Sequence, residues 1–267
     1  MLELQAFLLG ACIGSFINVV VYRVPAGLSI VHPPSRCPHC LTPLRWWQNL
    51  PILGWWLIGG KCFYCKAPVS WRYPAIELLT ALLFLGTAHY FRMAHPVAIL
   101  GYCAFLGWLL ALALIDLDTM LLPDSLTQSG LVAGLGFHLV WAWGLGINPV
   151  LNQIALPAQG VLFAVGGAVV GIWLLDIVRG LGSWLLGVEA MGAGDPRLLA
   201  MIGAWLGWQR VVVVVFLASG IGLGMALVMR LGRGQAFPFG PSLALAGGIT
   251  LFMGTDILQM YLRWFSL

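Results

Sequence analysis

Long apolar stretches alternate with short polar segments along nearly the whole chain. A membrane-spanning helix needs roughly 20 mostly apolar residues, and by that measure the sequence holds about eight such stretches. They cover residues 4–22, 75–90, 97–115, 126–145, 160–177, 197–207, 211–229 and 242–262. The sixth stretch is short and lies close to the seventh. The pattern predicts an all-α polytopic membrane protein with about eight transmembrane helices.

The composition supports this fold class. Of the 267 residues, 61% are hydrophobic and only 8% are charged, whereas a soluble domain carries about 25% charged residues. No basic run of the kind that binds nucleic acid is present. The first apolar stretch lacks a small-residue cleavage site, so we interpret it as a retained helix rather than a signal peptide.

The basic residues predict how the chain is oriented. The insertion between the first two stretches, residues 23–74, contains basic residues and no acid. If it is cytosolic, ten of the thirteen Lys and Arg residues are cytosolic, as the positive-inside rule requires. Those ten are Arg23, Arg36, Arg45, Lys61, Lys66, Arg72, Arg179, Arg197, Arg230 and Arg233. This topology predicts an external N-terminus and three parts: a first helix (1–22), a cytosolic insertion (23–74) and a membrane domain (75–267).

The insertion carries two C-x-x-C pairs. They are Cys37 with Cys40 and Cys62 with Cys65, about 20 residues apart, which is typical of a zinc ribbon. Four thiolates form a closed structural zinc site, and a small insertion with little core gains stability from one. Disulfides and a redox C-x-x-C are the alternatives, although cytosolic thiols stay reduced. His39 is interpreted as a turn residue, and Cys12 and Cys103 as core residues.

Acidic residues are rare, with nine in the whole chain. An ionisable residue at the end of a membrane helix is costly unless paired or hydrated, so its default interpretation is functional. Asp116 ends the third stretch and Asp195 precedes the sixth, both at the predicted cytosolic boundary. Two adjacent carboxylates share a proton, and the pair can then supply a general base and a general acid. We therefore predict that Asp116 and Asp195 are the catalytic pair of an aspartic protease.

Simpler interpretations of these acids stay open. Asp118 and Asp124 can be solvated loop acids, and Asp124, directly after Pro123, also suits the N-cap of the fourth helix. Asp195 can likewise be an N-cap alone. Gly192 and Gly194 are predicted to adopt positive φ or to let a peptide approach Asp195 closely.

In their order and spacing these motifs resemble those of the bacterial type IV prepilin peptidases, also called prepilin leader peptidase/N-methyltransferases. The resemblance runs from the sequence GSFINVVVYR at residues 14–23 through both C-x-x-C pairs and the stretch WWQNLP at 46–51. It continues with RYP at 72–74, ELLT at 77–80 and the D-x-D-x(4)-P-D stretch from Asp116. The G-x-G-D ending at Asp195 and PFGP at 238–241 complete it.

The resemblance implies a G-x-G-D membrane aspartic protease of the inner membrane, with Asp116 and Asp195 as its catalytic residues. Its implied partners are prepilins or pseudopilins of type IV pilus or type II secretion systems, and membrane lipid. The enzyme would cut their short basic leader on the cytosolic side after a glycine. It would then methylate the new N-terminus with S-adenosylmethionine. The cysteine-rich loop is associated in the family with zinc and with methyl transfer.

The methyl-donor site is not marked by a glycine-rich fingerprint. Arg72 and Glu77, at the junction of the insertion and the second stretch, are our predicted methyl-transfer residues. Their alternatives are an interfacial anchor and helix packing. The family usually has lysine two residues after the G-x-G-D aspartate, where this chain has Arg197, whose planar cation cannot be deprotonated. That residue either tunes the pair or anchors the helix.

Three other functions fit parts of this sequence. A transporter would use Asp116 and Asp195 as proton or cation sites, but such proteins usually show repeated halves, and none is evident. A thiol oxidoreductase would need its C-x-x-C pairs on the oxidising side. Some family members lack the cysteine loop and only cleave. Because this chain keeps all four cysteines, we predict both cleavage and methylation.

Overall fold

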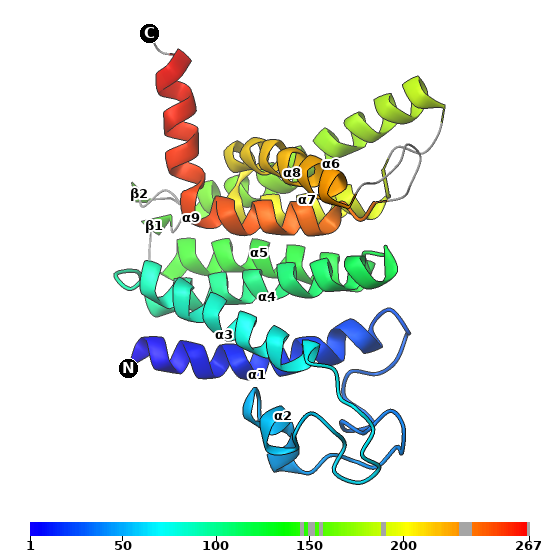
Figure 1. Cartoon of the computed structure of the whole chain (residues 1–267). Coiled ribbons are helices and arrows are strands. Elements are labelled where there is room, and N and C mark those ends of the chain that lie inside the picture. The colour runs from blue at the N-terminus through cyan, green and yellow to red at the C-terminus, as the bar shows by residue number, and fades with distance from the viewer. Residues whose placement is uncertain (145–146, 149–152, 155–156, 188–190, 230–236, 266–267) are drawn as a thin grey trace. The chain divides into compact units, whose positions relative to one another are not determined.

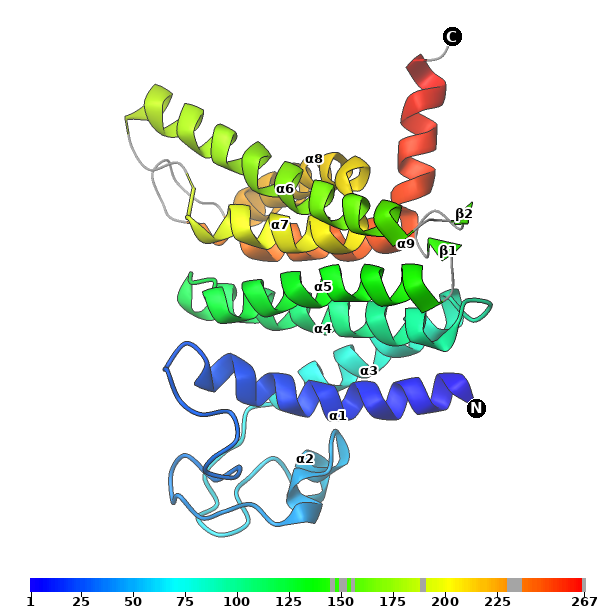
Figure 2. The ribbon, with the colours of Figure 1, turned by 180° about the vertical axis from the view of Figure 1, so that it is seen from behind.

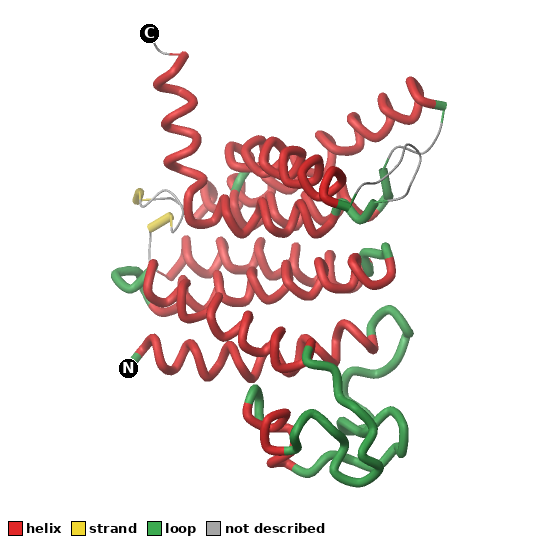
Figure 3. Tube along the Cα trace, viewed as in Figure 1, coloured by secondary structure: helices red, strands yellow, loops and turns green. Residues whose placement is uncertain are grey.

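The computed structural model describes residues 1–144, 147–148, 153–154, 157–187, 191–229 and 237–265. Helices dominate this part of the chain, and between α1 (Leu2–Arg23) and α3 (Arg72–Tyr90) lies a largely looped insertion that holds the short helices η1 (Trp46–Asn49) and α2 (Leu53–Leu57). One pair of two-residue strands is also present, β1 (Ile147–Asn148) and β2 (Gln153–Ile154) (Figures 1 and 3). The predicted all-α fold class is confirmed. The basic residues Arg230 and Arg233, used to predict topology, lie outside the described residues.

Each predicted apolar stretch coincides with one long helix. These helices are α1 (Leu2–Arg23), α3 (Arg72–Tyr90), α4 (Pro96–Thr119), α5 (Asp124–Gly144), α6 (Pro157–Leu186), α7 (Gly194–Leu206), α8 (Trp208–Val228) and α9 (Gly240–Phe265). Gly207 separates α7 from α8 with a φ of +83°, a left-handed conformation that glycine adopts without steric cost.

Within the described residues, five helices are long and apolar enough to cross a membrane, fewer than the eight stretches in the sequence. They are α1, α4, residues Gln159–Leu185 of α6, α8 and residues Gly240–Met260 of α9. The chain is therefore a membrane protein. The 13-residue helix α7 is too short to cross by itself, since crossing takes roughly 20 residues.

Two compact units make up the chain, Met1–Ala111 and Leu112–Leu267, with the boundary inside α4. In the first, α1 lies against α3. A Cβ atom at Gly10 or Gly14 would come within 2.7 Å of a backbone Cα atom of α3, so only glycine allows this approach. Closely packed helices with glycine four residues apart are a common solution in membranes, where hydrophobic burial does not drive association.

The same device joins α6 and α7 in the second unit. A Cβ atom on Gly167 would collide with the carbonyl of Gly203, and the reverse holds as well. The two helices run side by side in both ribbon views (Figure 2). On the other side of α7, toward α5, the buried Trp205 of α7 donates its indole N–H to the carbonyl of Gly130 on α5 at 2.9 Å. These contacts fix α7 between its neighbours, and α7 carries Asp195.

The prediction that both isolated cysteines are core residues is half right. Cys103 is buried beside Phe84 and Ile99. Cys12 is exposed, so the prediction is wrong for this residue. The reason is helical geometry: Gly10 and Gly14 share the face that packs on α3, and position 12 lies on another face.

Candidate active site

Asp116 lies near the C-terminal end of α4 and is almost fully buried, with 5% of its surface exposed. Its Oδ2 accepts a hydrogen bond of 2.9 Å from the backbone N–H of Gly240, the first residue of α9. The first N–H groups of a helix have no partner within the helix, and the positive end of the helix dipole favours a carboxylate. The start of α9 thus holds the Asp116 side chain in place.

Asp195 is the second residue of α7 and is as buried as Asp116, with 6% exposed. Burial, and then the negative charge of Asp116, raise the pKa of Asp195 to about 7. The two carboxyl groups are therefore close enough to interact, although they lie far apart in the sequence. A carboxyl group near an ionised one is harder to ionise, so the charge of Asp116 favours the protonated form of Asp195.

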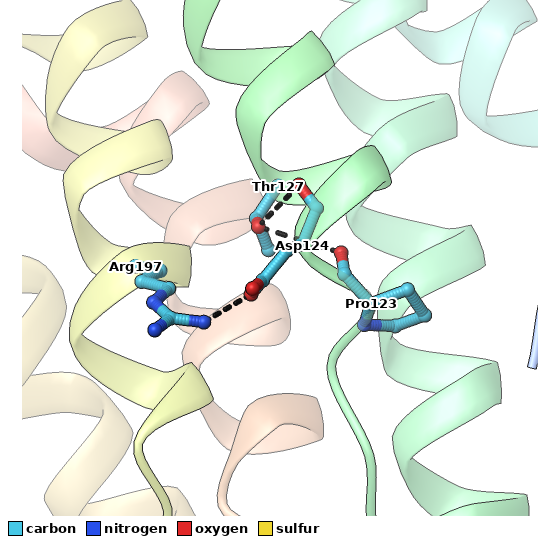
Figure 4. Close-up of polar contacts among 4 residues, drawn as sticks. All are labelled: Pro123, Asp124, Thr127 and Arg197. Carbon is cyan, nitrogen blue, oxygen red and sulfur yellow. Dashed lines mark hydrogen bonds and ion pairs between the residues drawn. The ribbon is translucent and has the colours of Figure 1, made fainter.

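The ion pair between Asp124 and Arg197 joins the first turns of α5 and α7 (Figure 4). Both side chains are about half exposed, at 51% and 47%. At the same helix start, the Thr127 hydroxyl hydrogen bonds to the carbonyl of Asp124 at 3.2 Å. Asp124 begins α5, as its N-cap interpretation expected, but its carboxylate pairs with Arg197. The residue that replaces the family lysine thus links two helices beside Asp195.

The two glycines before Asp195 differ in what surrounds them. Neither has a positive φ, so of the two roles expected for these glycines only the close approach of another chain stays a prediction. A Cβ atom on Gly194 would lie 2.7 Å from that of Leu122, which makes this glycine a packing residue. At Gly192 a Cβ atom would lie 3.7 Å from Oδ2 of Asp195, an ordinary contact. Gly192 is therefore the glycine that borders the carboxyl group.

Four helix ends converge around the two aspartates: the C-terminal end of α4 and the N-terminal ends of α5, α7 and α9. Asp118, two residues after Asp116, stays exposed on α4. A protonated carboxyl beside an ionised one can activate water and donate a proton to a leaving group. The geometry suits acid–base hydrolysis of a bond placed between the two groups.

The four cysteines of the insertion form a cluster in the first unit. Their sulfur atoms all lie within 4.8 Å of one another, and the Cys37–Cys65 and Cys40–Cys62 distances are 3.8 and 3.9 Å. A tetrahedral site with metal–sulfur bonds of about 2.3 Å places its sulfurs ~3.8 Å apart. All four are free thiols, which argues against the disulfide alternative. His39 is exposed and outside the cluster, as expected.

Two equivalent turns build this cluster. In the first, the N–H of Cys37 bonds to the carbonyl of Thr42, and in the second the N–H of Cys62 bonds to that of Ala67. Leu41 and Lys66, each directly after the second cysteine of its pair, share φ values near +60°, at 56° and 61°. Hydrogen bonds from the side chain and backbone of Thr42 lower the pKa of Cys40 to about 6. That favours the thiolate, the form that binds metal.

The predicted methyl-transfer residues lie where the insertion meets α3. Arg72 is the first residue of α3 and is half-buried. Glu77 is buried, and its Oε2 accepts a hydrogen bond of 2.6 Å from the N–H of Ile52 in the insertion. It also accepts one from the Ser15 hydroxyl on α1. The carboxylate of Glu77 thus joins the insertion to both helices.

Two family profiles match the chain in tandem. The Bacterial Peptidase A24 N-terminal domain matches residues 8–91, which include the four cysteines and Glu77. The Type IV leader peptidase family matches residues 103–227, which include Asp116 and Asp195. Proteins named Prepilin leader peptidase/N-methyltransferase from Stutzerimonas stutzeri and Neisseria gonorrhoeae are each 37% identical to this chain. The alignments cover 98% and 97% of this chain and 94% and 93% of those proteins.

The chain belongs to the type IV leader peptidase family. A protein of the same name from Pseudomonas aeruginosa is also 37% identical, over 98% of this chain and 93% of its own length. No solved structure matches the chain. Family membership gives the transporter hypothesis no support, because these relatives are named as peptidases and methyltransferases and align with this chain over nearly their full length.

Sequence reasoning missed the partners of the two sites. It did not assign Gly240 to Asp116, Arg197 to Asp124 or Ile52 to Glu77. The signal for Gly240 was its place directly before Pro241 at the start of an apolar stretch, since proline favours the first turn of a helix. Nothing in the sequence indicated that this helix start faces Asp116.

Proposed function

We propose that this protein cleaves the leader peptide of type IV prepilins or pseudopilins and then N-methylates the new terminus. The observation that carries the proposal is the pair of buried carboxyl groups, Asp116 and Asp195, in a chain of the leader peptidase family. Burying ionisable side chains in a membrane protein costs free energy, so such residues usually have a functional role. We expect the scissile bond to follow a glycine, as in the family that the sequence resembles.

In the proposed cleavage step, one carboxylate takes a proton from water while the water oxygen attacks the peptide carbonyl. The other, protonated carboxyl donates its proton to the carbonyl oxygen, which gives a tetrahedral diol. When the diol collapses, the proton taken from water passes from the first carboxyl to the leaving amine, and a diol hydroxyl returns its proton to the second carboxylate. The Gly240 N–H on Asp116 favours the ionised form of that group. The raised pKa of Asp195 suits the proton-carrying role. We therefore assign the base to Asp116 and the acid to Asp195.

We assign methyl transfer to the first unit. The four cysteines have the donor set and spacing of a structural zinc site, and zinc there would hold the insertion folded. S-adenosylmethionine, when bound, supplies the methyl group. Because hydrogen bonds from Ile52 and Ser15 occupy Glu77, it suits the shaping of that site rather than contact with the donor. For contact with the donor we propose Arg72, a half-buried cation at the same junction.

We further propose the inner membrane as the location, with the N-terminus external. The insertion and both aspartates would then face the cytosol. The support is the distribution of basic residues, which places six in an insertion without any acid.

The test is leader cleavage of a prepilin by the purified protein in detergent. Asp116→Asn and Asp195→Asn should each abolish cleavage while the helical circular dichroism and thermal unfolding stay like wild type. Asp118→Asn is the matched control, because this exposed residue sits on the same helix. Full cleavage by either variant of the pair would remove that residue from the catalytic machinery.

A further inference from the structure

The short helix α2 (Leu53–Leu57) exposes an apolar face on the cysteine-rich insertion. Leu53, Trp56 and Leu57 have 61%, 69% and 63% of their surfaces exposed. Their spacing of three and four residues places them on one side of the helix. Soluble surfaces seldom carry such a patch without a binding partner. Because α2 belongs to the insertion and not to a predicted membrane helix, its exposed apolar face indicates that something binds there.

The opposite side of α2 is firmly attached. Ile52, directly before the helix, is bound to Glu77. Trp55 donates its indole N–H to the carbonyl of Val69 at 2.9 Å. Gly54 is packed so closely on Gln48 that a Cβ atom would lie 2.5 Å from its carbonyl oxygen. The apolar face is thus held in a fixed direction by internal contacts.

These contacts also attach α2 to the membrane part of the first unit. Glu77 lies in the second turn of α3, and α3 packs along α1, which is long and apolar enough to cross a membrane. Both ribbon views show α2 next to α1 (Figures 1 and 2), and α2 also contacts α3. An element attached to these helices borders the bilayer, and tryptophan is enriched where a bilayer meets water.

The positive charge of the insertion indicates which partner the apolar face of α2 binds. Residues 23–74 contain six basic residues and no acidic one. Arg45 and Lys61, on either side of α2 in the sequence, are both exposed. A positive segment attracts anionic lipid headgroups and repels a cationic peptide. An apolar face with tryptophan and flanking basic residues is the composition of an interfacial anchor.

We propose that the outer face of α2 docks into the anionic lipid leaflet on its side of the membrane, with Trp56 as the anchor. Trp56 and Leu57 enter the headgroup boundary, and Arg45 and Lys61 meet lipid phosphates. The docking fixes the four-cysteine cluster at the membrane surface. It requires only that the chain is inserted in a membrane, and it is independent of the proposed activity.

The experiment uses the full chain in nanodiscs of phosphatidylglycerol or phosphatidylcholine with brominated acyl chains, which quench nearby tryptophan. The emission of Trp56 is obtained by subtracting the spectrum of Trp56→Phe from that of wild type, and the emission of Trp47 is obtained in the same way from Trp47→Phe. Trp47 is the control, because its ring packs edge-on against Phe63 within the insertion. Unchanged helical circular dichroism and thermal unfolding confirm that each variant is folded.

We expect the Trp56 component to lose most of its emission in brominated phosphatidylglycerol, clearly more than in phosphatidylcholine and more than the Trp47 component. An unquenched Trp56 component would overturn the docking. Equal quenching in both lipids would overturn the choice of an anionic leaflet. Quenching of Trp47 as strong as that of Trp56 would overturn the assigned face.

Discussion

Gly240 touches the Asp116 carboxylate so closely that no side chain fits between them. A Cβ atom at this position would lie 2.6 Å from Oδ2 of Asp116, while the Gly240 N–H holds the same oxygen. The residue therefore positions a proposed catalytic group without taking part in proton transfer itself.

We expect Gly240→Ala to lower the rate of leader cleavage by about 100-fold, since a displacement of ~1 Å can cost that much. Gly136→Ala is the control, because a Cβ atom on that helical glycine meets nothing within 4 Å. The measurement is kcat/KM for a purified prepilin, with thermal unfolding in parallel. Cleavage by Gly240→Ala at the wild-type rate would show that Asp116 tolerates displacement.

The raised pKa of Asp195 leads to a prediction about pH. Burial and the charge of Asp116 favour its protonated form up to about pH 7, and the proposed acid must hold a proton to act. Cleavage should therefore decline as pH rises through about 7, with an apparent pKa that belongs to the pair. The measurement is kcat/KM from roughly pH 5.5 to 9, with folding verified at each pH. A rate that keeps rising with pH would contradict the assigned proton.

At the scale of elements, the ion pair between Asp124 and Arg197 links the starts of α5 and α7. Because both side chains are half exposed, the pair should contribute no more than about 1 kcal/mol to stability. Its effect on catalysis should be larger, because Arg197 follows Asp195 by two residues in the first turns of α7.

Asp124→Asn and Arg197→Gln should each lower cleavage about tenfold, equivalent to ~1.4 kcal/mol on the barrier. Arg197→Lys should retain most activity, since it keeps the charge. The double variant should be no worse than either single one, because the same interaction is lost in all three. Strictly additive losses in this double-mutant cycle would show that the two residues act separately.

At the scale of the whole molecule, the two sites lie in different units. The cysteine cluster belongs to Met1–Ala111 and both aspartates belong to Leu112–Leu267. This separation predicts that the two proposed activities can be lost independently.

Cys62→Ser, or removal of metal with a chelator, should abolish methylation while leaving leader cleavage largely intact. The physical reason is that the insertion has little core, so a metal bound by the four cysteines would hold it folded. Zinc content, cleavage and methyl incorporation are measured on the same samples. Cys12→Ser, an exposed cysteine outside the cluster, is the control. Parallel loss of cleavage and methylation would mean that the second unit depends on the cluster.

The sequence by itself determined the helices, the cysteine cluster and the unusual acids. Apolar stretches of membrane-spanning length coincide with the long helices because burial in lipid depends on length and composition. The C-x-x-C spacing predicted the cluster because each turn is local and needs only neighbouring residues. The rarity of acids singled out Asp116 and Asp195 because an ionisable group in these surroundings is costly.

Only the tertiary structure decided which groups meet across the chain. The N–H of Gly240 reaches Asp116, the guanidinium of Arg197 reaches Asp124, and Glu77 binds Ile52. Each contact depends on the direction in which two helix ends or a loop approach, and close glycine packing sets that direction. The same packing left Cys12 exposed against expectation. Local pattern fixes what each segment is, whereas the partners of a side chain depend on how distant segments pack.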